Sequence, residues 1–290
     1  IYLGRPVNLG FALHFPLLQR KGNNIMCASG TEEQQMRILR AIISSFARQS
    51  DFSVDIMADS YASVYREYKP EILEFGKNYP EIRVHDDLED ICYKIVETLE
   101  IIKDRSNTRK QLIVWLGLDS MADILADERN KRTPVLKKAE EKATQSEVSE
   151  SVSEEESEKT DFNDPALDEF SALFGDMDLF GEEDINEEEP ETGKEAQTSY
   201  LYDARNDIAR IIHLGPTCNV FNLVIYDSAS ALRDFREVKT LDFNHKIAFP
   251  MSDYEAGEFL DQPRLIRELS GQLAYYHNGR FGNRFVPYKL

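Results

Sequence analysis

Residues 139–196 limit what this chain can fold into more than any other segment, because they carry its entire net charge. The segment holds 22 acidic and 3 basic residues, and this balance of −19 equals the formal net charge of the 290-residue chain. Glu and Ser are abundant and β-branched residues are few, so folding the segment would bury too little apolar area to offset the lost conformational entropy. We therefore expect a disordered acidic insert.

The rest of the chain has the composition of a folded body. Acidic and basic residues number 31 each outside the insert, and 41% of the whole chain is hydrophobic. This supply of apolar residues excludes full disorder. The overall acidity argues against a protein that coats nucleic acids through a generally basic surface. This argument does not apply to the body outside the insert, because its charges balance.

The termini and the cysteines bear on location. No run of about 18 uncharged apolar residues occurs, and the N-terminus lacks a signal peptide, so we expect a cytoplasmic chain without a membrane span. Cys27, Cys92 and Cys218 are odd in number and far apart, which favours reduced core thiols over disulfides. Because the chain begins at Ile1 rather than Met, we expect it to be the end of a longer protein.

Strand-like and helix-like patterns alternate on both sides of the insert. An apolar run at residues 24–29 precedes a helical pattern in which Met36, Leu39 and Ile43 share one face. Further strands are predicted at 52–57, 111–116, 221–226 and 244–249, further helices at 86–102 and 201–212, and a hairpin at 274–276 and 284–288. The alternation predicts one α/β domain with a doubly wound, mainly parallel sheet. Its two parts are residues 1–138 and 197–290.

The first strand-to-helix turn lies where α/β folds bind phosphate, because helix N-terminal amides face a ligand there. A working P-loop needs two glycines five residues apart, a Lys and a Ser or Thr. This turn has the single glycine Gly30 and no lysine, and Glu32 and Glu33 would repel a phosphate. Thr31 and Gln34 also form a capping-box pattern that satisfies the amides locally. The pattern favours a structural turn over a nucleotide site.

No catalytic constellation is visible elsewhere. The strand at 111–116 is followed by Gly117 and Leu118 and reaches an acid only at Asp119, which we interpret as the N-cap of the next helix rather than a magnesium ligand. Asp86, with Glu89 three residues later, is predicted to cap the helix that follows it. Cys92 fits an apolar helix face. The histidines lack the spacing of a zinc site: His14, His85, His213, His245 and His277.

Two segments have candidate binding roles. The first is a basic cluster beside the insert, which is either a DNA-phosphate contact or a solvated linker neutralised by its acidic neighbour: Arg129, Lys131, Arg132, Lys137 and Lys138. The second is a predicted short helix at 165–174 inside the insert, where Leu167, Phe170 and Phe174 fall on one face. That face either docks into a groove on a partner or on this domain, or stays unbound.

Six motifs follow one another along the chain, at residues 2–6, 22–25, 112–117, 214–227, 245–253 and 284–288. Taken in this order, they resemble the FtsK/SpoIIIE family of DNA-translocating ATPases. More narrowly, the chain is similar to the degenerate ATPase-like domain that ends certain large members. The resemblance implies a RecA-like P-loop fold in a hexameric ring around double-stranded DNA, with ATP and Mg²⁺ bound between subunits.

At the nucleotide site, the chain lacks residues that the active members of that family carry. The turn at Gly30 lacks the lysine, no acid follows Leu116 directly, and Tyr226, Asp227 and Ser228 stand where active members carry a glutamine. The resemblance therefore implies a pseudo-ATPase that binds no cofactor itself, contacts DNA and joins a homo-oligomeric ring or other ATPase domains of a longer chain. The alternative is an adaptor whose insert recruits a partner protein.

Overall fold

The computed structural model describes residues 1–7, 11–49, 51–105, 107–121, 204–260, 264, 266–267 and 269–288. The elements in chain order are β1 (Tyr2–Pro6), β2 (Leu13–His14), β3 (Ile25–Ala28), α1 (Glu32–Phe46), β4 (Phe52–Ala58), α2 (Ser63–Asn78), β5 (Ile82–His85), α3 (Leu88–Asp104), β6 (Lys110–Leu116), α7 (Ala204–Leu214), β7 (Val220–Tyr226), β8 (His245–Ala248), α8 (Asp253–Leu260), β9 (Ala274–His277) and β10 (Gly282–Pro287).

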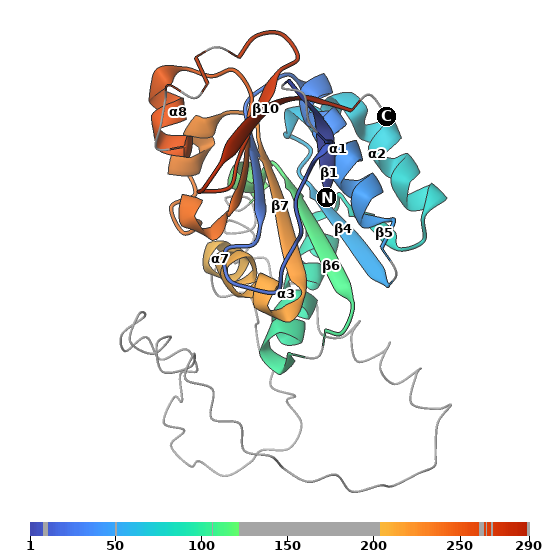
Figure 1. Cartoon of the computed structure of the whole chain (residues 1–290). Coiled ribbons are helices and arrows are strands. Elements are labelled where there is room, and N and C mark those ends of the chain that lie inside the picture. Colours follow the sequence, from blue (N-terminus) through green and yellow to red (C-terminus); the bar gives the residue numbers. More distant parts are fainter. Residues whose placement is uncertain are drawn as a thin grey trace, which may run out of the picture. The chain divides into compact units, whose positions relative to one another are not determined.

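One mixed sheet of ten strands runs through the described part of the chain, in the order β2-β1-β10-β9-β8-β3-β7-β6-β4-β5 (Figure 1). Strands β8, β3, β7, β6, β4 and β5 are parallel to one another, and the remaining four strands pair antiparallel. The predicted α/β class with a mainly parallel, doubly wound sheet is thereby confirmed. Strands from both sides of residues 122–203 belong to this one sheet.

Alternate residues of the central strands face two different cores, as the two-residue period of a strand requires. On one face, Cys27 and Val114 pack with α1 and α2. On the other face, Met26 and Trp115 pack with α3, α7 and α8. Because both faces are covered by helices, the parallel strands are apolar on both sides. The three cysteines are free thiols, two of them buried and Cys92 half-buried.

The crossover from β6 to β7 is the longest connection in the fold. The chain leaves the sheet after Leu116, is described as far as residue 121, and is described again from α7, which packs against α3 and leads into β7. Strand β7 then lies directly beside β6, with Leu112 paired to Phe221. The insert predicted at 139–196 and its helix at 165–174 lie outside the described residues.

The predicted cap of α3 is wrong by one residue. Helix α3 is capped by Asp87, whose carboxylate accepts the N–H groups of Glu89 and Asp90 at 3.0 and 3.4 Å. Asp86 instead accepts the hydroxyl of Tyr65 at 2.6 Å and Nζ of Lys69 at 2.9 Å, because β5 ends at His85 and leaves Asp86 facing α2. The carboxylate therefore joins the start of α3 to α2.

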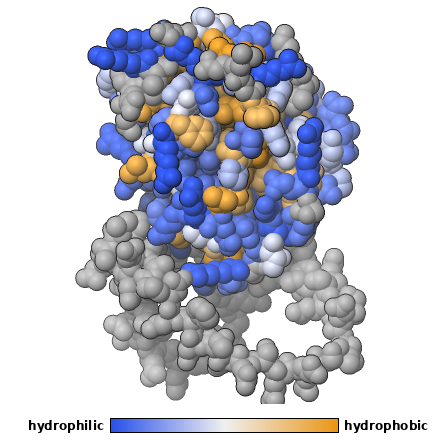
Figure 2. Space-filling model, in the orientation of Figure 1, coloured by the Kyte–Doolittle hydropathy of each residue, from blue (hydrophilic) through white to orange (hydrophobic). Residues whose placement is uncertain are grey.

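The surface shown in Figure 2 mixes apolar and hydrophilic residues, with apolar ones standing out in its upper and central part. The most exposed large apolar side chains among the described residues are Phe11, Leu241 and Tyr61. None of the described helices combines the length and the apolar character needed to cross a bilayer.

Candidate functional site

The carboxyl ends of β3, β7 and β6 form the edge of the sheet at which open α/β folds bind ligands. The turn of Ser29, Gly30 and Thr31 follows β3, Asp227 follows β7, and Asp119 lies three residues beyond β6. The N–H of Ser29 donates to the Tyr226 carbonyl at 3.1 Å and links the first two of these ends. The fold therefore brings Gly30, Thr31 and Asp119 to one edge.

The turn between β3 and α1 is closed by its own first helical turn. Only three residues separate Ala28 from Glu32. Thr31 caps the helix: its hydroxyl accepts the N–H of Gln34 at 3.3 Å, and its own N–H donates to Gln34 Oε1 at 2.8 Å. This reciprocal pair is the capping box that the sequence predicts, and that prediction is confirmed. Amides that would face a phosphate in a P-loop are bonded to a neutral side chain instead.

Gln35 fills the space beneath this turn. Its side chain is 1% exposed, and its amide Nε2 donates to the carbonyls of Ser29 and Tyr226 at 3.4 and 3.3 Å. The amide thus bridges the end of β3 and the end of β7. Sequence reasoning missed this role. A polar residue directly after the capping residues could have indicated it, because the first helical turn lies next to the strand ends.

Residues from the C-terminal third of the chain cover the turn from outside. The ring of Phe249 is fully buried and lies 2.7 Å from where a Cβ on Gly30 would be placed. Gln34 Nε2 donates to the Gly271 carbonyl at 2.8 Å, and Arg37 Nη1 donates to Gln272 Oε1 at 3.0 Å. The positive φ of Gly30, 90°, lets the backbone pass under this cover.

Asp119 does not cap the helix after β6, contrary to the sequence prediction. That helix begins at Leu118, and the N–H of Met121 donates to the Gly117 carbonyl at 2.9 Å, so Gly117 takes the cap position. Gly117 has a φ of 75°, which its missing side chain permits. Asp119 consequently sits inside the first turn, half-buried. Burial raises the pKa of its carboxyl, and the negative charge of Asp227 adds to that rise.

The other carboxylates at this edge are held by hydroxyl and amide donors. Asp227 accepts the N–H and the hydroxyl of Ser63 at 3.2 and 2.7 Å. Asp59, which sequence reasoning did not single out, is buried at the end of β4 and accepts the hydroxyl of Ser120. Asp59 could have been predicted from its position, because it is an acidic residue directly after an apolar strand. These bonds use the carboxylates to join strand ends to helix starts.

A nucleotide with magnesium, the ligand usual for this fold, does not fit the residues present. The space around the turn is taken by Gln34, Gln35 and Phe249, and the carboxylates of Asp119 and Asp227 lie at the same edge of the sheet, where they repel phosphate. Across the described ranges, which stop at residue 121 and resume at 204, no group of three His, Cys, Asp or Glu residues could hold a metal ion.

The remaining predicted site residues lie outside the described ranges. These are the basic cluster of Arg129, Lys131, Arg132, Lys137 and Lys138, and the apolar stripe of Leu167, Phe170 and Phe174. Both stay predictions.

Comparison with known proteins gives structural neighbours only. No protein-family model and no curated protein matches the sequence. The cytoplasmic domain of the type VII secretion ATPase EccC from Thermomonospora curvata matches 99% of this chain and 28% of its own, with 12% identity and a TM-score of 0.52. ATPases 2 and 3 of the same EccC, solved with a signal sequence peptide, match 99% of this chain and 41% of theirs, with 9% identity and a TM-score of 0.54.

A third structural neighbour is a conjugation protein. The pCW3 coupling protein TcpA, in a monomer form with ATPγS, matches 99% of this chain and 65% of its own, with 9% identity and a TM-score of 0.51. This chain thus spans less than two thirds of each neighbour. The likeness, with the central strand order β8-β3-β7-β6-β4, identifies the fold as the RecA-like fold of P-loop ATPase domains from secretion and conjugation proteins.

Proposed function

We propose that this chain is a pseudo-ATPase domain of an FtsK/SpoIIIE-like DNA translocase. It contributes contacts to a ring and to double-stranded DNA in the cytoplasm, and ATP is hydrolysed by another domain. The observation that carries the proposal is the closed turn between β3 and α1, where Gln34 and Gln35 occupy the amides and the space that a phosphate needs. The fold supports the ATPase ancestry, and the closed turn supports the loss of nucleotide binding.

Thermal unfolding of the full chain with and without Mg·ATP tests the loss of binding. A nucleotide at a hundredfold its Kd would stabilise the folded state by about 2.7 kcal/mol. We expect no shift in Tm and no phosphate release above background, for the chain and equally for its Gln34→Ala variant. An ATPase domain with an intact P-loop serves as the positive control in the same buffer. A saturable rise in Tm would refute the proposal.

A second candidate function is an adaptor that recruits a partner protein through the insert. The specific observation in its favour is that the EccC neighbour was solved in complex with a signal sequence peptide, so a protein that contains this fold can recruit a peptide. In this chain the docking residues would be Leu167, Phe170 and Phe174.

Deleting residues 139–196 separates the two functions. A ring component should keep its oligomeric state and its affinity for duplex DNA after the deletion, whereas an adaptor should lose its partner. The full-length double variant Phe170→Ala/Phe174→Ala is the sharper test of the adaptor, because it leaves the charge of the insert unchanged. Sedimentation and DNA binding at two salt concentrations give the readouts, since phosphate contacts weaken as salt rises.

A further inference from the structure

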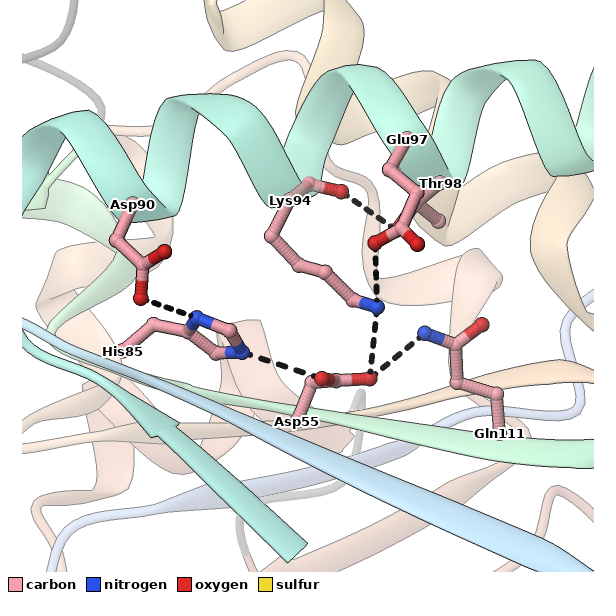
Figure 3. A network of polar contacts seen from close by, with 7 residues as sticks. All are labelled: Asp55, His85, Asp90, Lys94, Glu97, Thr98 and Gln111. Atoms are coloured by element: carbon pink, nitrogen blue, oxygen red, sulfur yellow. Dashed lines mark hydrogen bonds and ion pairs between the residues drawn. The ribbon is translucent and has the colours of Figure 1, made fainter. Parts of the chain in front are cut away.

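A network of charged groups lies in the core between the sheet and α3 (Figure 3). Its centre is Asp55 on β4, which is 1% exposed. The Asp55 carboxylate accepts Nε2 of Gln111 from β6 at 2.8 Å and lies 3.3 Å from Nζ of Lys94 on α3. Its second oxygen lies 3.1 Å from Nε2 of His85 on β5. Four elements therefore meet at one buried carboxylate.

The His85 ring lies between two carboxylates. Its Nε2 faces Asp55, and its Nδ1 lies 2.8 Å from Oδ2 of Asp90 in the first turn of α3. A neutral imidazole has one N–H and one lone pair, so one of the two contacts would then place a lone pair against a carboxylate oxygen. Both contacts are attractive only in the imidazolium form, in which both nitrogens donate.

The charges around the ring support the same protonation state. Burial lowers the pKa of His85, but the hydrogen bonds to Asp55 and Asp90 outweigh it and raise the pKa above its ordinary value. Burial alone would raise the pKa of Asp55, yet donors from His85, Lys94 and Gln111 bring it below its ordinary value. The directions of both pKa shifts therefore favour the ion pair between the His85 imidazolium and the Asp55 carboxylate.

Further charged groups lie on α3 and β5. On α3, Lys94 also pairs with Glu97 at 2.8 Å. On β5 itself, Arg83 is exposed, and the neighbouring Asp86 is held by Tyr65 and Lys69 of α2. With the ring protonated, His85 and Lys94 oppose Asp55, Asp90 and Glu97. Without that proton, Lys94 alone opposes the three carboxylates.

The geometry points to a proton-operated latch: the His85 imidazolium holds the first turn of α3 to the edge strand β5 and to buried Asp55, and loss of its proton releases that turn. Strand β5 is the last strand of the sheet and has a single strand neighbour, β4. Asp90 is only three residues beyond the helix cap and 57% exposed on its side chain. Water can therefore replace the ring as its partner.

The sign of the pH dependence follows from the direction of the shift. A histidine whose folded-state pKa lies above its unfolded value stabilises the fold fully at pH below the unfolded pKa, about 6.5. That contribution is lost as the pH rises through the folded pKa. The latch is therefore closed in mild acid and opens in the neutral to alkaline range.

NMR titration and amide exchange of the full chain test the latch. The His85 ring signals, assigned by their loss in His85→Gln, should titrate with a midpoint above the ordinary histidine value. Exchange of amides 88–91, corrected for intrinsic pH dependence, should rise severalfold through the same midpoint. The conservative variant Asp90→Asn should lower both midpoints together, and Glu100→Gln, an exposed change farther along α3, should leave both unchanged.

Two outcomes would overturn the latch. One is a His85 midpoint at or below the ordinary value. The other is a constant exchange rate at residues 88–91 while His85 titrates, which would mean that the ion pair is present without controlling the helix. Because Asp90 is more than half exposed, Asp90→Asn is expected to fold even if His85→Gln does not, so the experiment keeps a usable variant.

Discussion

The turn after β3 and the network around Asp55 handle polar groups in opposite ways. In the turn, neutral side chains only a few residues away satisfy the backbone, as Thr31 and Gln34 do for each other. Around Asp55, charged groups come from β4, β5 and α3 and are far apart in sequence. The start of α1, at the edge where this fold ordinarily holds a charged ligand, is thus capped by local, neutral bonds. The ionic groups around Asp55 lie inside the helix-covered core, where they join elements.

The largest expected effect lies in the network. Asp55→Ala leaves Lys94 and His85 buried without their shared carboxylate, and breaking a buried pair in this way costs about 3–5 kcal/mol. Urea unfolding at pH 7 measures the loss. The matched control is Glu71→Ala, which removes an ion pair with Arg40 that is partly exposed, so it should cost less than about 1 kcal/mol. Equal losses in the two variants would mean that the buried Asp55 network stabilises the fold no more than a partly exposed ion pair does.

A smaller effect is expected at the turn. Gly30→Ala places a Cβ 2.7 Å from the Phe249 ring at a φ of 90°, and the backbone strain alone costs about 1–2 kcal/mol. Gly257→Ala in α8 is the control, since nothing lies within 4 Å of its new methyl group and the helix gains about 0.5–1 kcal/mol. The two glycine substitutions should therefore shift Tm in opposite directions. If Gly30→Ala caused no loss of stability, the turn would not be packed as described.

The smallest effect is expected at the cap of α1. Thr31→Ala removes the hydroxyl that accepts the Gln34 N–H and should cost about 1 kcal/mol, whereas Thr31→Ser keeps the acceptor and should cost less. The double variant Thr31→Ala/Gln34→Ala should cost less than the sum of the single variants, because each breaks the same reciprocal box. Strict additivity, measured by thermal unfolding, would show that the two bonds do not act together.

The sequence allows prediction of what depends on neighbouring residues. The capping box at Thr31, the helix it begins and the apolar central strands all follow from local spacing. Helix α2 was not predicted, because its segment contains Pro70, which removes a helical hydrogen bond, and the helix is kinked at Tyr68. Strand β5 was not predicted either, because its four residues are too few to establish a period.

The same distinction between local and distant partners separates the residues of the site and of the network that could be predicted from those that could not. Gly30 and Thr31 were found from their local motif, whereas Gln35 and Asp59 act through residues far along the chain. His85 looked isolated because the sequence spacing of its partners, Asp55 and Asp90, carries no pattern. Only the parallel pairing of Met57 with His85 brings the ring beside Asp55.

The crossover between β6 and β7 has a consequence for how such a domain can change over time. Its ends are fixed by the sheet and by the packing of α7 against α3, both of which are built from residues outside 122–203. The entropy lost on closing a connection grows with the logarithm of its length, so each doubling costs only about 0.6 kcal/mol. If the connection is a flexible loop, insertions and deletions in it have little effect on folding, and the charge carried there can diverge independently of the core.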